Sequence, residues 1–583
     1  MKKTEQIALT KEMENFREVL ENSSKIYKDN VAYKYKKDPE AKEIKYIEKK
    51  YSQVNKDVKA LSTALIEHKL AGKRIAIIGG NRYEWVISYF AITCGGMIVA
   101  PMDKLLPESE IISLIRRSEV SAVIFDKKYL DTFIKLKNDP KAKLDTLICM
   151  DEVENENVVL WNNLLEEGKK LIKNGNKSYE KVKIDNNAMS IMLFTSGTTS
   201  EAKIVMLSQK NICSNLYGYQ THFKILPSDT LLSFLPIHHT FESSITILYG
   251  FYCGATIAFC DGLRYIAANL KEYQVSVFVA VPLLLETMYK KIKKAIADQG
   301  KTKQMEQAVK LSNALLKVHI DVRAKLFKQI RDNFGGKLRI VLYGAAALDK
   351  ETIIGFDNFG INSIQGYGLT ETSPVIAAES EARHKPGAAG YPLDNVEVKI
   401  LNPDKNGLGE IVAKGPNIML GYYNDEKKTK EAFDDGWFKT GDFGYIDEDG
   451  FIFITGRKGD IIVLRNGKNV YPQEIEFKLG SKLPYIKESI VFARNETKTD
   501  TVLVAKIVYD KEIMDRNYAG KDYEKVIWND VKEFNKDLPT FKHIKKILVT
   551  DEPMEKTTTQ KVKRNKAIEK AEKELAKKEA EEK

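Results

Sequence analysis

The sequence predicts an α/β fold, with layered α/β subdomains and a β-rich subdomain in a large N-terminal domain and a small, mobile α+β domain after it. Over most of the first 380 residues, short β-branched runs such as RIAIIG (74–79) and SAVIFD (121–126) alternate with amphipathic segments. This alternation is typical of parallel sheets covered by helices. After about Gly390 the pattern changes to paired strands with turn signals such as Asp449-Gly450.

In the first part of the chain, strands are predicted in order at 74–79, 97–103, 121–126, 190–194, 230–236, 256–260, 277–282 and 338–344. The first two helices are predicted at 83–94 and 107–119, where apolar residues recur at helical spacing. A long amphipathic helix is predicted at 299–332, with many lysines opposite an apolar stripe of Leu311, Leu315, Val318, Val322, Leu326 and Ile330. This stripe could pack against its own domain or rest on a membrane surface.

The last part of the chain predicts a separate small unit. A hairpin turning at 466–467 precedes a helix from Pro472, the strands ESIVFAR and TVLVAKIVY, and a long helix that ends near Leu538. The tail is almost wholly Lys, Glu and Ala, which predicts a solvated helix or a frayed end. We therefore expect four parts: a large domain, a hinge, a small domain and a charged tail, at 1–456, 457–459, 460–566 and 567–583.

The composition of the 583-residue chain is that of an ordinary globular protein, with 43% hydrophobic and 30% charged residues. No apolar run approaches the roughly 20 residues of a membrane span, and the first residues lack the apolar core of a signal peptide. We expect a cytoplasmic protein, at most peripheral at the inner membrane surface. The net charge of +11 fits nucleotides, an anionic membrane surface or a lysine-rich solvated surface. No nucleic-acid motif or metal-ligand cluster is found, and the five scattered cysteines indicate reduced, buried thiols.

The stretch FTSGTTSEAKIVMLSQKN (194–211) places hydroxyl groups, a glycine and a lysine behind a short apolar strand. Its spacing fits neither the phosphate loop that ends in Gly-Lys-Ser/Thr nor the dinucleotide-binding glycine pattern. Hydroxyl groups, accessible backbone amides and an ammonium group are nevertheless what a phosphate needs. Taken alone, the stretch is either a phosphate-holding loop or an ordinary turn. Its candidate ligands are Thr195, Ser196, Gly197, Thr198, Thr199 and Lys203.

Further segments follow this loop along the chain. QGYGLTETSP (365–374) places an aromatic ring, a hydroxyl group and a carboxylate within five residues. DGWFKTGDFG (435–444), GRKGDIIVLRNGKNVYPQEIE (456–476) and KTTTQKVKR (556–564) come after it. Their order and spacing resemble the adenylate-forming superfamily of acyl-CoA synthetases, luciferases and peptide-synthetase adenylation domains, over nearly the whole chain. LPIHHTFE and YGAAAL also match, and the C-terminal segments look most like the long-chain fatty acyl-CoA synthetase branch.

The resemblance implies a reaction in two halves. A carboxylate attacks the α-phosphate of ATP to give an acyl-adenylate and pyrophosphate, and the thiol of CoA then displaces AMP. Because negative charge meets negative charge in the first half, the site must supply cations and oriented donors around the phosphates. The implied ligands are a fatty acid, ATP with Mg²⁺, and CoA. Another carboxylate, a separate acyl carrier protein as acceptor, and a non-catalytic nucleotide-binding relative are the alternatives.

The resemblance also implies a role for each matched residue. The loop at 195–203 would hold the β- and γ-phosphates, Thr370 would reach the α-phosphate, and Glu371 would hold Mg²⁺. Lys561 would bridge the acyl carboxylate and the α-phosphate, with His239 beside the carboxylate pocket. Tyr367 would stack on adenine beside Gly344, Ala345 and Ala346, and Gly368 belongs to the same ATP/AMP-binding set. Asp442 would accept both ribose hydroxyl groups, helped by Arg457.

Most of these positions also have a purely structural interpretation. Glu371 and Asp442 could cap a turn or a helix. His239 could be a packed histidine, and Lys561 could lie on a solvated basic face. The segment VPLLLETMYKKI (281–292) could wall an acyl tunnel, or it could simply pack in the core.

Two places depart from the family pattern. Relatives usually read TSGTTG-x-PKG, so Ser200, Ala202 and Ile204 replace residues that set backbone freedom rather than phosphate contact. We therefore expect weaker ATP binding, and Ser200→Gly should lower the KM for ATP. The second departure is at the expected hinge, Lys458-Gly459, where relatives usually carry Asp or Lys in place of Gly459. A glycine permits a backbone change there without steric cost.

Overall fold

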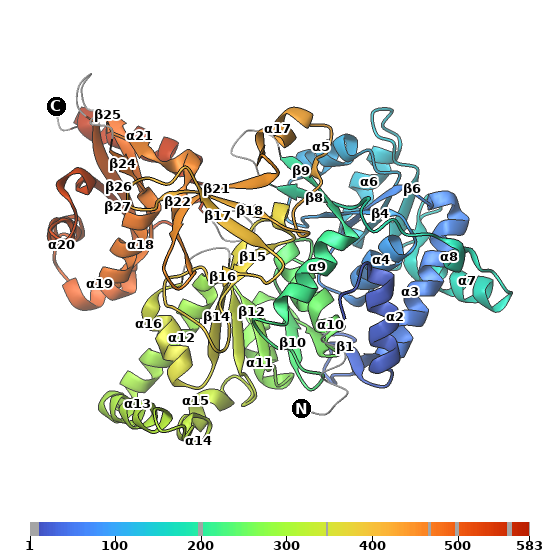
Figure 1. The fold of residues 1–583 in the computed structure, drawn as a ribbon, viewed down its shortest axis with the longest axis horizontal. Helices are drawn as coiled ribbons and strands as arrows, with labels where there is room; N and C mark the ends of the chain where they lie inside the picture. The colour runs from blue at the N-terminus through green and yellow to red at the C-terminus, as the bar shows by residue number, and fades with distance from the viewer. Residues whose placement is uncertain are drawn as a thin grey trace. The chain divides into compact units, whose positions relative to one another are not determined.

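The computed structural model describes residues 11–195, 202–344, 348–464, 468–495, 501–556 and 562–581. The chain folds as two compact units, which Figure 1 colours by position along the chain. The large unit comprises 1–398 and 413–438, and the small unit comprises 399–412 and 439–583. Residues 399–412 and 439–456, which we expected in the large domain, thus belong to the compact small unit. The hinge at 457–459 stays a prediction.

The large unit contains two sheets, and the first has nine strands. The strands from β14 to β1 run parallel in this sheet, whereas β15, β16 and β2 are antiparallel to their neighbours. Parallel neighbours need crossover connections, which the intervening helices provide. The strand order is β16 (Tyr391–Pro392), β15 (Val375–Ala378), β14 (Asn362–Gly368), β13 (Ile340–Tyr343), β12 (Val277–Ala280), β10 (Thr230–Ser233), β11 (Thr256–Phe259), β1 (Val31–Lys36) and β2 (Tyr46–Lys50).

The second sheet of the large unit has eight strands. Six of them are parallel, and β9 and β19 run antiparallel at one end. Strand β19 comes from much later in the chain than β9, and the pairing of Tyr422 with Val205 joins them. The strand order is β19 (Gly421–Tyr422), β9 (Lys203–Ser208), β8 (Met189–Thr195), β4 (Ile98–Met102), β3 (Arg74–Ile78), β5 (Ala122–Phe125), β6 (Thr146–Cys149) and β7 (Val159–Leu160). The predicted α/β class is confirmed.

Helices pack on these sheets. Helix α4 is buried along its whole length, which agrees with its apolar sequence. Helices α7 and α3 meet at Gly168, where an added Cβ would lie 1.8 Å from the carbonyl oxygen of Ala60. The helices are α2 (Phe16–Ile26), α3 (Tyr51–Leu65), α4 (Tyr83–Cys94), α5 (Glu108–Ser118), α6 (Leu130–Lys137), α7 (Trp161–Lys173), α8 (Ser178–Lys181), α9 (Gln209–Tyr219), the π-helix η3 (Phe241–Tyr249), α10 (Gly250–Tyr252), α11 (Ile266–Glu272), α16 (Lys350–Asn358) and α17 (Glu426–Glu431).

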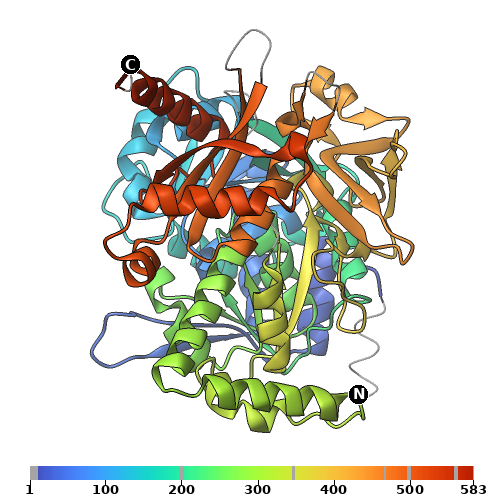
Figure 2. The ribbon, with the colours of Figure 1, turned by 90° about the vertical axis from the view of Figure 1, so that its left-hand side faces the viewer.

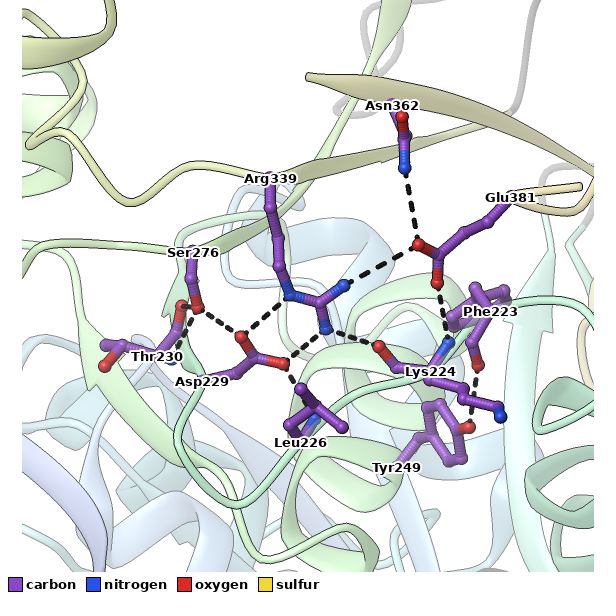
Figure 3. Close-up of polar contacts among 10 residues, drawn as sticks. All are labelled: Phe223, Lys224, Leu226, Asp229, Thr230, Tyr249, Ser276, Arg339, Asn362 and Glu381. Atoms are coloured by element: carbon purple, nitrogen blue, oxygen red, sulfur yellow. Dashed lines mark hydrogen bonds and ion pairs between the residues drawn. The ribbon is translucent and has the colours of Figure 1, made fainter. Parts of the chain in front are cut away.

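A polar cluster fixes the amino ends of four parallel strands (Figure 3). Arg339, just before β13, pairs with Asp229, just before β10, through Nε–Oδ1 at 3.1 Å and Nη2–Oδ2 at 2.6 Å. Ser276, just before β12, donates its hydroxyl group to Asp229 Oδ1 at 2.7 Å. Asn362, at the start of β14, donates to Glu381 at 3.3 Å, and this carboxylate lies 3.9 Å from Arg339 Nη1. These bonds tie the amino edge of the sheet, so ligands are expected at the opposite, carboxyl edge.

The region predicted as one long helix at 299–332 is instead broken into short helices. The backbone of His319 has φ 62°, which ends the helical run, and the elements are α12 (Pro282–Asp298), α13 (Thr302–Leu316), α14 (Arg323–Leu326) and α15 (Lys328–Asp332). The predicted apolar stripe is therefore wrong as a packing face. Met305, Ala308 and Val309 pack on the core instead. Of the stripe, Ile330 is buried, whereas its other members are half-buried or exposed.

The small unit holds the predicted strand-rich C-terminal region (Figure 2). A five-stranded sheet contains β17 (Glu397–Leu401), β18 (Gly409–Lys414), β21 (Trp437–Ile446) and β22 (Ile452–Arg457), together with β20 (Phe433–Asp434), whose residues are assigned to the large unit. The predicted hairpin is present as a paired two-stranded ladder, although its turn at 465–467 lies outside the described residues. The remaining elements are β23 (Ile462–Val463), β24 (Asn469–Val470), α18 (Pro472–Lys482), β25 (Ile486–Asn495), β26 (Thr501–Tyr509), α19 (Lys511–Tyr518), α20 (Tyr523–Asn535), β27 (Ile544–Thr550) and α21 (Arg564–Glu581).

The charged tail is a packed helix rather than a frayed end. One face of α21 buries Ala567, Ala571 and Leu575 against a cluster that includes residues of β25 and β26. Glu574 pairs with Lys506 at 2.6 Å, which adds a charged contact beside this apolar face. Only the other face is solvated, because Ala and Leu recur at helical spacing within the Lys/Glu run. None of the helices in the described part of the chain has the length and apolar composition needed to cross a bilayer.

Candidate active site

The hairpin of β8 and β9 carries the expected phosphate loop. Thr195, the last residue of β8, pairs in register with Lys203, the first residue of β9. The loop between them, with the candidate ligands Ser196, Gly197, Thr198 and Thr199 and the variant position Ser200, lies outside the described residues. The base of the loop is held from α5, where Arg117 Nη2 donates to the carbonyl oxygen of Ala202 at 2.7 Å.

Ile204, one of the departures from the family pattern, faces the core. Its side chain is 3% exposed and belongs to the apolar cluster beneath the eight-stranded sheet, with Ala202 packed at the edge of that cluster. A glycine here would remove this apolar contact. The departure at Ile204 therefore has a packing reason that the sequence did not reveal.

Tyr422 joins two of the expected charged residues. Its hydroxyl group donates to Glu371 Oε1 at 2.9 Å, and Lys203 Nζ lies 4.6 Å from the centre of its ring. The position of the ring is set by β19, which pairs with β9, and by the Tyr422 amide, which donates to Thr429 Oγ1 at 2.9 Å. Burial and the adjacent Glu371 carboxylate raise the pKa of Tyr422, so its phenol stays protonated. Sequence reasoning missed this residue, although GYY at 421–423 was a visible aromatic signal.

Glu371 and Thr370 lie in a short 3₁₀ turn, η5 (Thr370–Thr372), directly after β14. The Thr372 hydroxyl group shapes this turn, since it accepts from the Leu369 amide at 2.9 Å and donates to the Pro374 carbonyl at 2.7 Å. Met419 N donates to the Glu371 carbonyl at 2.9 Å and fixes the backbone there. The side chains of Thr370 and Glu371 are half-exposed and can meet a ligand at the carboxyl end of β14.

Two of the expected adenine-contacting positions come together at the ends of β13 and β14. These strands are parallel neighbours, so Gly344, just after β13, lies near Tyr367 in β14. An added Cβ at Gly344 would lie 3.0 Å from the Gly366 carbonyl oxygen, and one at Gly368 would lie 1.8 Å from that of Pro374. The close backbone approach therefore requires a glycine at 368, whereas at 344 a side chain would make a tight contact that needs a small backbone shift. Ala345 and Ala346 lie outside the described residues.

His239 lies in the half-buried turn between β10 and η3. Its Nδ1 accepts from the Phe241 amide at 3.2 Å, which places the proton of a neutral ring on Nε2. His238 beside it lies 3.8 Å from Asp103, and burial lowers the pKa of His238. Glu242 lies three residues after His239. Burial raises the pKa of Glu242 to about 8, and the Ser233 hydroxyl group donates to its carboxyl group at 2.6 Å.

A small apolar cavity adjoins this turn. None of the described residues that line it is charged, and it reaches the backbone of Gly366, one residue from Tyr367. The predicted tunnel wall at 281–292 contributes no lining residue, because Leu285 is fully buried in the core and Leu284 and Met288 pack against it. The lining residues are Phe223, Phe241, Ile245, Leu342, Tyr343, Ile364, Gly366, Val375 and Ala378.

In the small unit, Asp442 and Arg457 are register partners in β21 and β22. Arg457 Nε lies 2.8 Å from Asp442 Oδ1, and Asp442 is only 4% exposed. The guanidinium compensates the buried carboxylate, which would otherwise be costly. Thr440 supports the pair, because its hydroxyl group accepts from the Asp442 amide at 3.1 Å and donates to the Ile411 carbonyl at 2.8 Å.

The expected hinge residues lie in the turn η6 (Lys458–Asp460). Lys458 Nζ pairs with Glu410 at 2.7 Å, and among the described residues no atom beyond the two chain neighbours lies within 4 Å of a Cβ added at Gly459. Gln473 donates to Asp460, the residue after this glycine. Packing therefore does not require a glycine at 459, which leaves backbone freedom as its physical advantage.

The segment that carries Lys561 lies outside the described residues, but both of its flanks are anchored. Before it, Lys556 pairs with Glu488 at 2.6 Å. After it, Arg564 pairs with Glu476 at 2.7 Å and lies 3.8 Å from Asp460. Within the described residues, no group of three His, Cys, Asp or Glu side chains could hold a metal ion. A single carboxylate such as Glu371 nevertheless suits Mg²⁺, which keeps phosphate and water ligands.

Two family patterns match the chain. The one described as AMP-binding enzyme matches residues 20–423, and the one described as AMP-binding enzyme C-terminal domain matches residues 459–582. Long-chain-fatty-acid–CoA ligase 6 of Homo sapiens is 30% identical over 550 residues, which cover 85% of this chain and 77% of the relative. The chloroplastic long-chain-fatty-acid–[acyl-carrier-protein] ligase AEE15 of Arabidopsis thaliana is 24% identical over 580 residues, covering 87% and 79%.

Solved structures share the fold. The anthranilate CoA ligase AuaEII in complex with anthranoyl-AMP has a TM-score of 0.76 at 18% identity, over 96% of this chain and 98% of that chain. A fatty acyl CoA synthetase of Mycobacterium tuberculosis has a TM-score of 0.65 at 20% identity, over 96% and 98%. At such identities the likeness concerns the fold alone.

Proposed function

Because the chain belongs to the AMP-binding enzyme family, we propose that it activates a long-chain fatty acid with ATP and transfers the acyl group to CoA. The enzyme is an acid–thiol ligase that releases pyrophosphate in the first step and AMP in the second. The observation that carries this function is the group Lys203, Tyr422 and Glu371, in which one tyrosine contacts both a cation and a carboxylate beside the phosphate loop.

Each polar residue has a task in the first half-reaction. Lys203 supplies positive charge to the β- and γ-phosphates, together with the hydroxyl groups of the loop. Thr370 donates a hydrogen bond to the α-phosphate, and Lys561 neutralises the charge that builds as the acyl carboxylate approaches it. Glu371 would hold Mg²⁺, which supplies further positive charge to the phosphates. In the small unit, the Asp442 carboxylate accepts the ribose hydroxyl groups, with Arg457 beside it.

The acyl substrate is inferred from the family and its relatives, not from a visible tunnel. The apolar cavity beside Phe241 and Gly366 has a volume of only about 10 Å³, so its lining side chains would have to move apart before an alkyl chain could enter. The names of the curated relatives point to a long chain, which we extend to this enzyme.

Pyrophosphate release tests the proposal. We would measure it with saturated fatty acids of increasing length and with an aromatic acid, each with and without CoA. Long-chain acids should give turnover only with CoA, and a Glu371→Gln preparation controls for contaminating ligases. If only the aromatic acid gave pyrophosphate release, the substrate would be an aromatic acid rather than a fatty acid. If no acid gave pyrophosphate release, a non-catalytic nucleotide-binding protein would be favoured.

A carrier protein is the second candidate acceptor. The Arabidopsis thaliana relative is named as an acyl-carrier-protein ligase and aligns over 87% of this chain, which favours testing it. In the same assay, phosphopantetheinylated acyl carrier protein would replace CoA. A higher kcat/KM with the carrier protein than with CoA would identify it as the acceptor.

A further inference from the structure

The large unit has an exposed apolar surface on α13, α14 and the turn between them. Five of the fifteen exposed large hydrophobic side chains among the described residues fall in this short segment, residues 311–326, which we call the docking turn. Figures 1 and 2 show α13 and α14 at the periphery of the large unit, away from its two sheets. The five are Leu311 (56% exposed), Leu316 (36%), Val318 (62%), Ile320 (52%) and Leu326 (41%).

The local structure explains why these side chains stay uncovered. Helix α13 packs on the core through Met305, Ala308 and Val309, so its contact with the unit is already made by another face. After Leu316 the helix ends, and apolar side chains alternate with Lys317 and His319 through an exposed stretch. An apolar patch with no cover on a globular protein usually marks an interaction site.

The surroundings of the docking turn are strongly basic. Residues 282–332 contain twelve Lys and Arg against five Asp and Glu, which is +7 of the net charge of +11 of the whole chain. Lys310, Lys317 and Lys325 are exposed and have no ion pair with any described residue. By contrast, Arg323 pairs with Asp321 at 2.7 Å and is part of the internal packing. Three lysines are thus available to an external partner.

The positive charge and the exposed apolar side chains of the docking turn together indicate what kind of partner it binds. A second copy of the chain would bring the same positive charge and repel this surface. A surface that combines anionic groups with an apolar interior fits both features, since leucine, valine and isoleucine can enter it while lysines remain at the phosphate level. We propose that the docking turn binds an anionic lipid surface. The enzyme then works at a membrane without a spanning helix, and this proposal does not depend on the acyl substrate.

Vesicle sedimentation tests the proposal. The full chain is mixed with phosphatidylcholine vesicles that contain about a third or no phosphatidylglycerol, at low and at high salt. Binding is expected only with phosphatidylglycerol and should weaken with salt. Replacing Lys310, Lys317 and Lys325 by Gln should lower the partition coefficient about a hundredfold, at about fivefold per lysine.

Matched variants separate the docking turn from general surface charge. Lys141, Lys170 and Lys183 are also exposed lysines of the large unit without an ion pair to a described residue, and their replacement by Gln should change binding by less than about threefold. Val318→Ser with Ile320→Ser should lower binding at least about tenfold, whereas Leu263→Ser, at a side chain 74% exposed elsewhere, should not.

Other outcomes would overturn the proposal. Equal loss in the two lysine sets would mean non-specific charge attraction. Full binding by the Val318→Ser, Ile320→Ser variant would mean that apolar insertion plays no part. Absence of vesicle binding, with a concentration-dependent dimer that this variant abolishes in light scattering, would assign the surface to a second copy of the chain. Near-normal circular dichroism of each variant shows that it is folded.

Discussion

Tyr422 lies between the two charged groups that the proposed chemistry uses in the large unit. Its hydroxyl group orients the Glu371 carboxylate, and its ring provides a face for the Lys203 ammonium, an arrangement in which a cation and an aromatic ring attract each other. Since Tyr422 touches these side chains rather than the reacting atoms, we regard it as a positioning residue. Its neighbour Tyr423 makes a similar hydroxyl–carboxylate bond with Glu119 at 2.9 Å, in a different place.

The two adjacent tyrosines give a matched test. Tyr422→Phe removes one hydrogen bond to a carboxylate, so we expect the Mg²⁺ concentration for half-maximal activity to rise about tenfold, with a smaller change in kcat. Tyr423→Phe removes a bond of the same kind outside the site, and the Mg²⁺ dependence should be unchanged. Initial rates of pyrophosphate release over a Mg²⁺ series measure both. Identical Mg²⁺ curves for the two variants would contradict the positioning role.

Glu242 predicts a pH dependence of stability. It is fully buried, Ser233 and Thr246 donate to its two oxygens at 2.6 and 2.9 Å, and burial raises its pKa to about 8. The folded state thus holds a proton that the unfolded chain loses near its ordinary pKa of about 4.3. The stabilising contribution of this proton is complete below that pH, and it is lost as the pH rises toward 8.

Glu242→Gln isolates this effect, because the amide has nearly the same shape and does not titrate. The difference in unfolding free energy between the variant and the parent should shift toward the variant by up to about 1.4 kcal/mol per pH unit from about pH 5 to about pH 8. Urea unfolding across this range measures the shift. A difference that stays constant with pH would mean that Glu242 is not the protonated group.

At the level of elements, helix α21 lies in a Lys/Glu-rich segment and still buries one apolar face in the core of the small unit. Leu575 is 4% exposed, so Leu575→Ala should destabilise the small unit by about 2–5 kcal/mol. Lys577→Ala on the exposed face of the same helix should cost less than about 0.5 kcal/mol. Thermal unfolding followed by limited proteolysis of the C-terminal region compares the two variants. Equal stability would mean that the helix is not docked in solution.

In the region 299–332 the sequence pattern did not predict the packing. Its apolar periodicity predicted one continuous helix, but the left-handed backbone at His319 ends α13 and turns the chain. Residues beyond that turn no longer follow the periodicity of α13. Before the turn, α13 packs on the core through Met305, Ala308 and Val309. Leu311 and Val318 of the predicted stripe are therefore exposed, and they belong to the proposed lipid-binding surface.

At the level of the whole molecule, the proposed reaction needs residues of both units. Lys561 belongs to the small unit, while Lys203 and Glu371 belong to the large unit. If the turn at 458–459 is the hinge between two arrangements, its backbone angles must change between the half-reactions. Proline would restrict that change, because it fixes φ.

Gly459→Pro should therefore leave adenylate formation largely intact and lower thioester formation at least about a hundredfold. Gly459→Ala is the matched control. In the described part of the chain, no atom beyond the two chain neighbours lies within 4 Å of the added Cβ, so both half-reactions should be nearly normal. Pyrophosphate release in a single turnover measures the first step, and transfer from isolated acyl-adenylate to CoA measures the second. Equal loss of both steps in the proline variant would refute the hinge.

The sequence by itself determined the fold class, most strands of the parallel sheets, and the chemical groups of the candidate site. These follow from local patterns: β-branched runs at strand length, and motifs whose hydroxyl, carboxylate and cationic groups are contiguous in the chain. The roles of Thr370 and Glu371 are those that the family resemblance of the segment QGYGLTETSP implies, and the two residues lie in one short turn. Asp442 and Arg457 were assigned to ribose binding by resemblance, and only the antiparallel ladder places the two side by side as an ion pair.

Only the tertiary structure decided which residues from distant segments meet. Tyr422 reaches Glu371 because β19 adds to the edge strand β9, and no local pattern encodes a pairing across more than 200 residues. Burial was likewise invisible in the sequence: Ile204 in the phosphate hairpin and Leu575 in the charged tail are both core residues. The reason is the same in each case. A side chain's environment is set by the elements that pack against it, and these come from other parts of the chain.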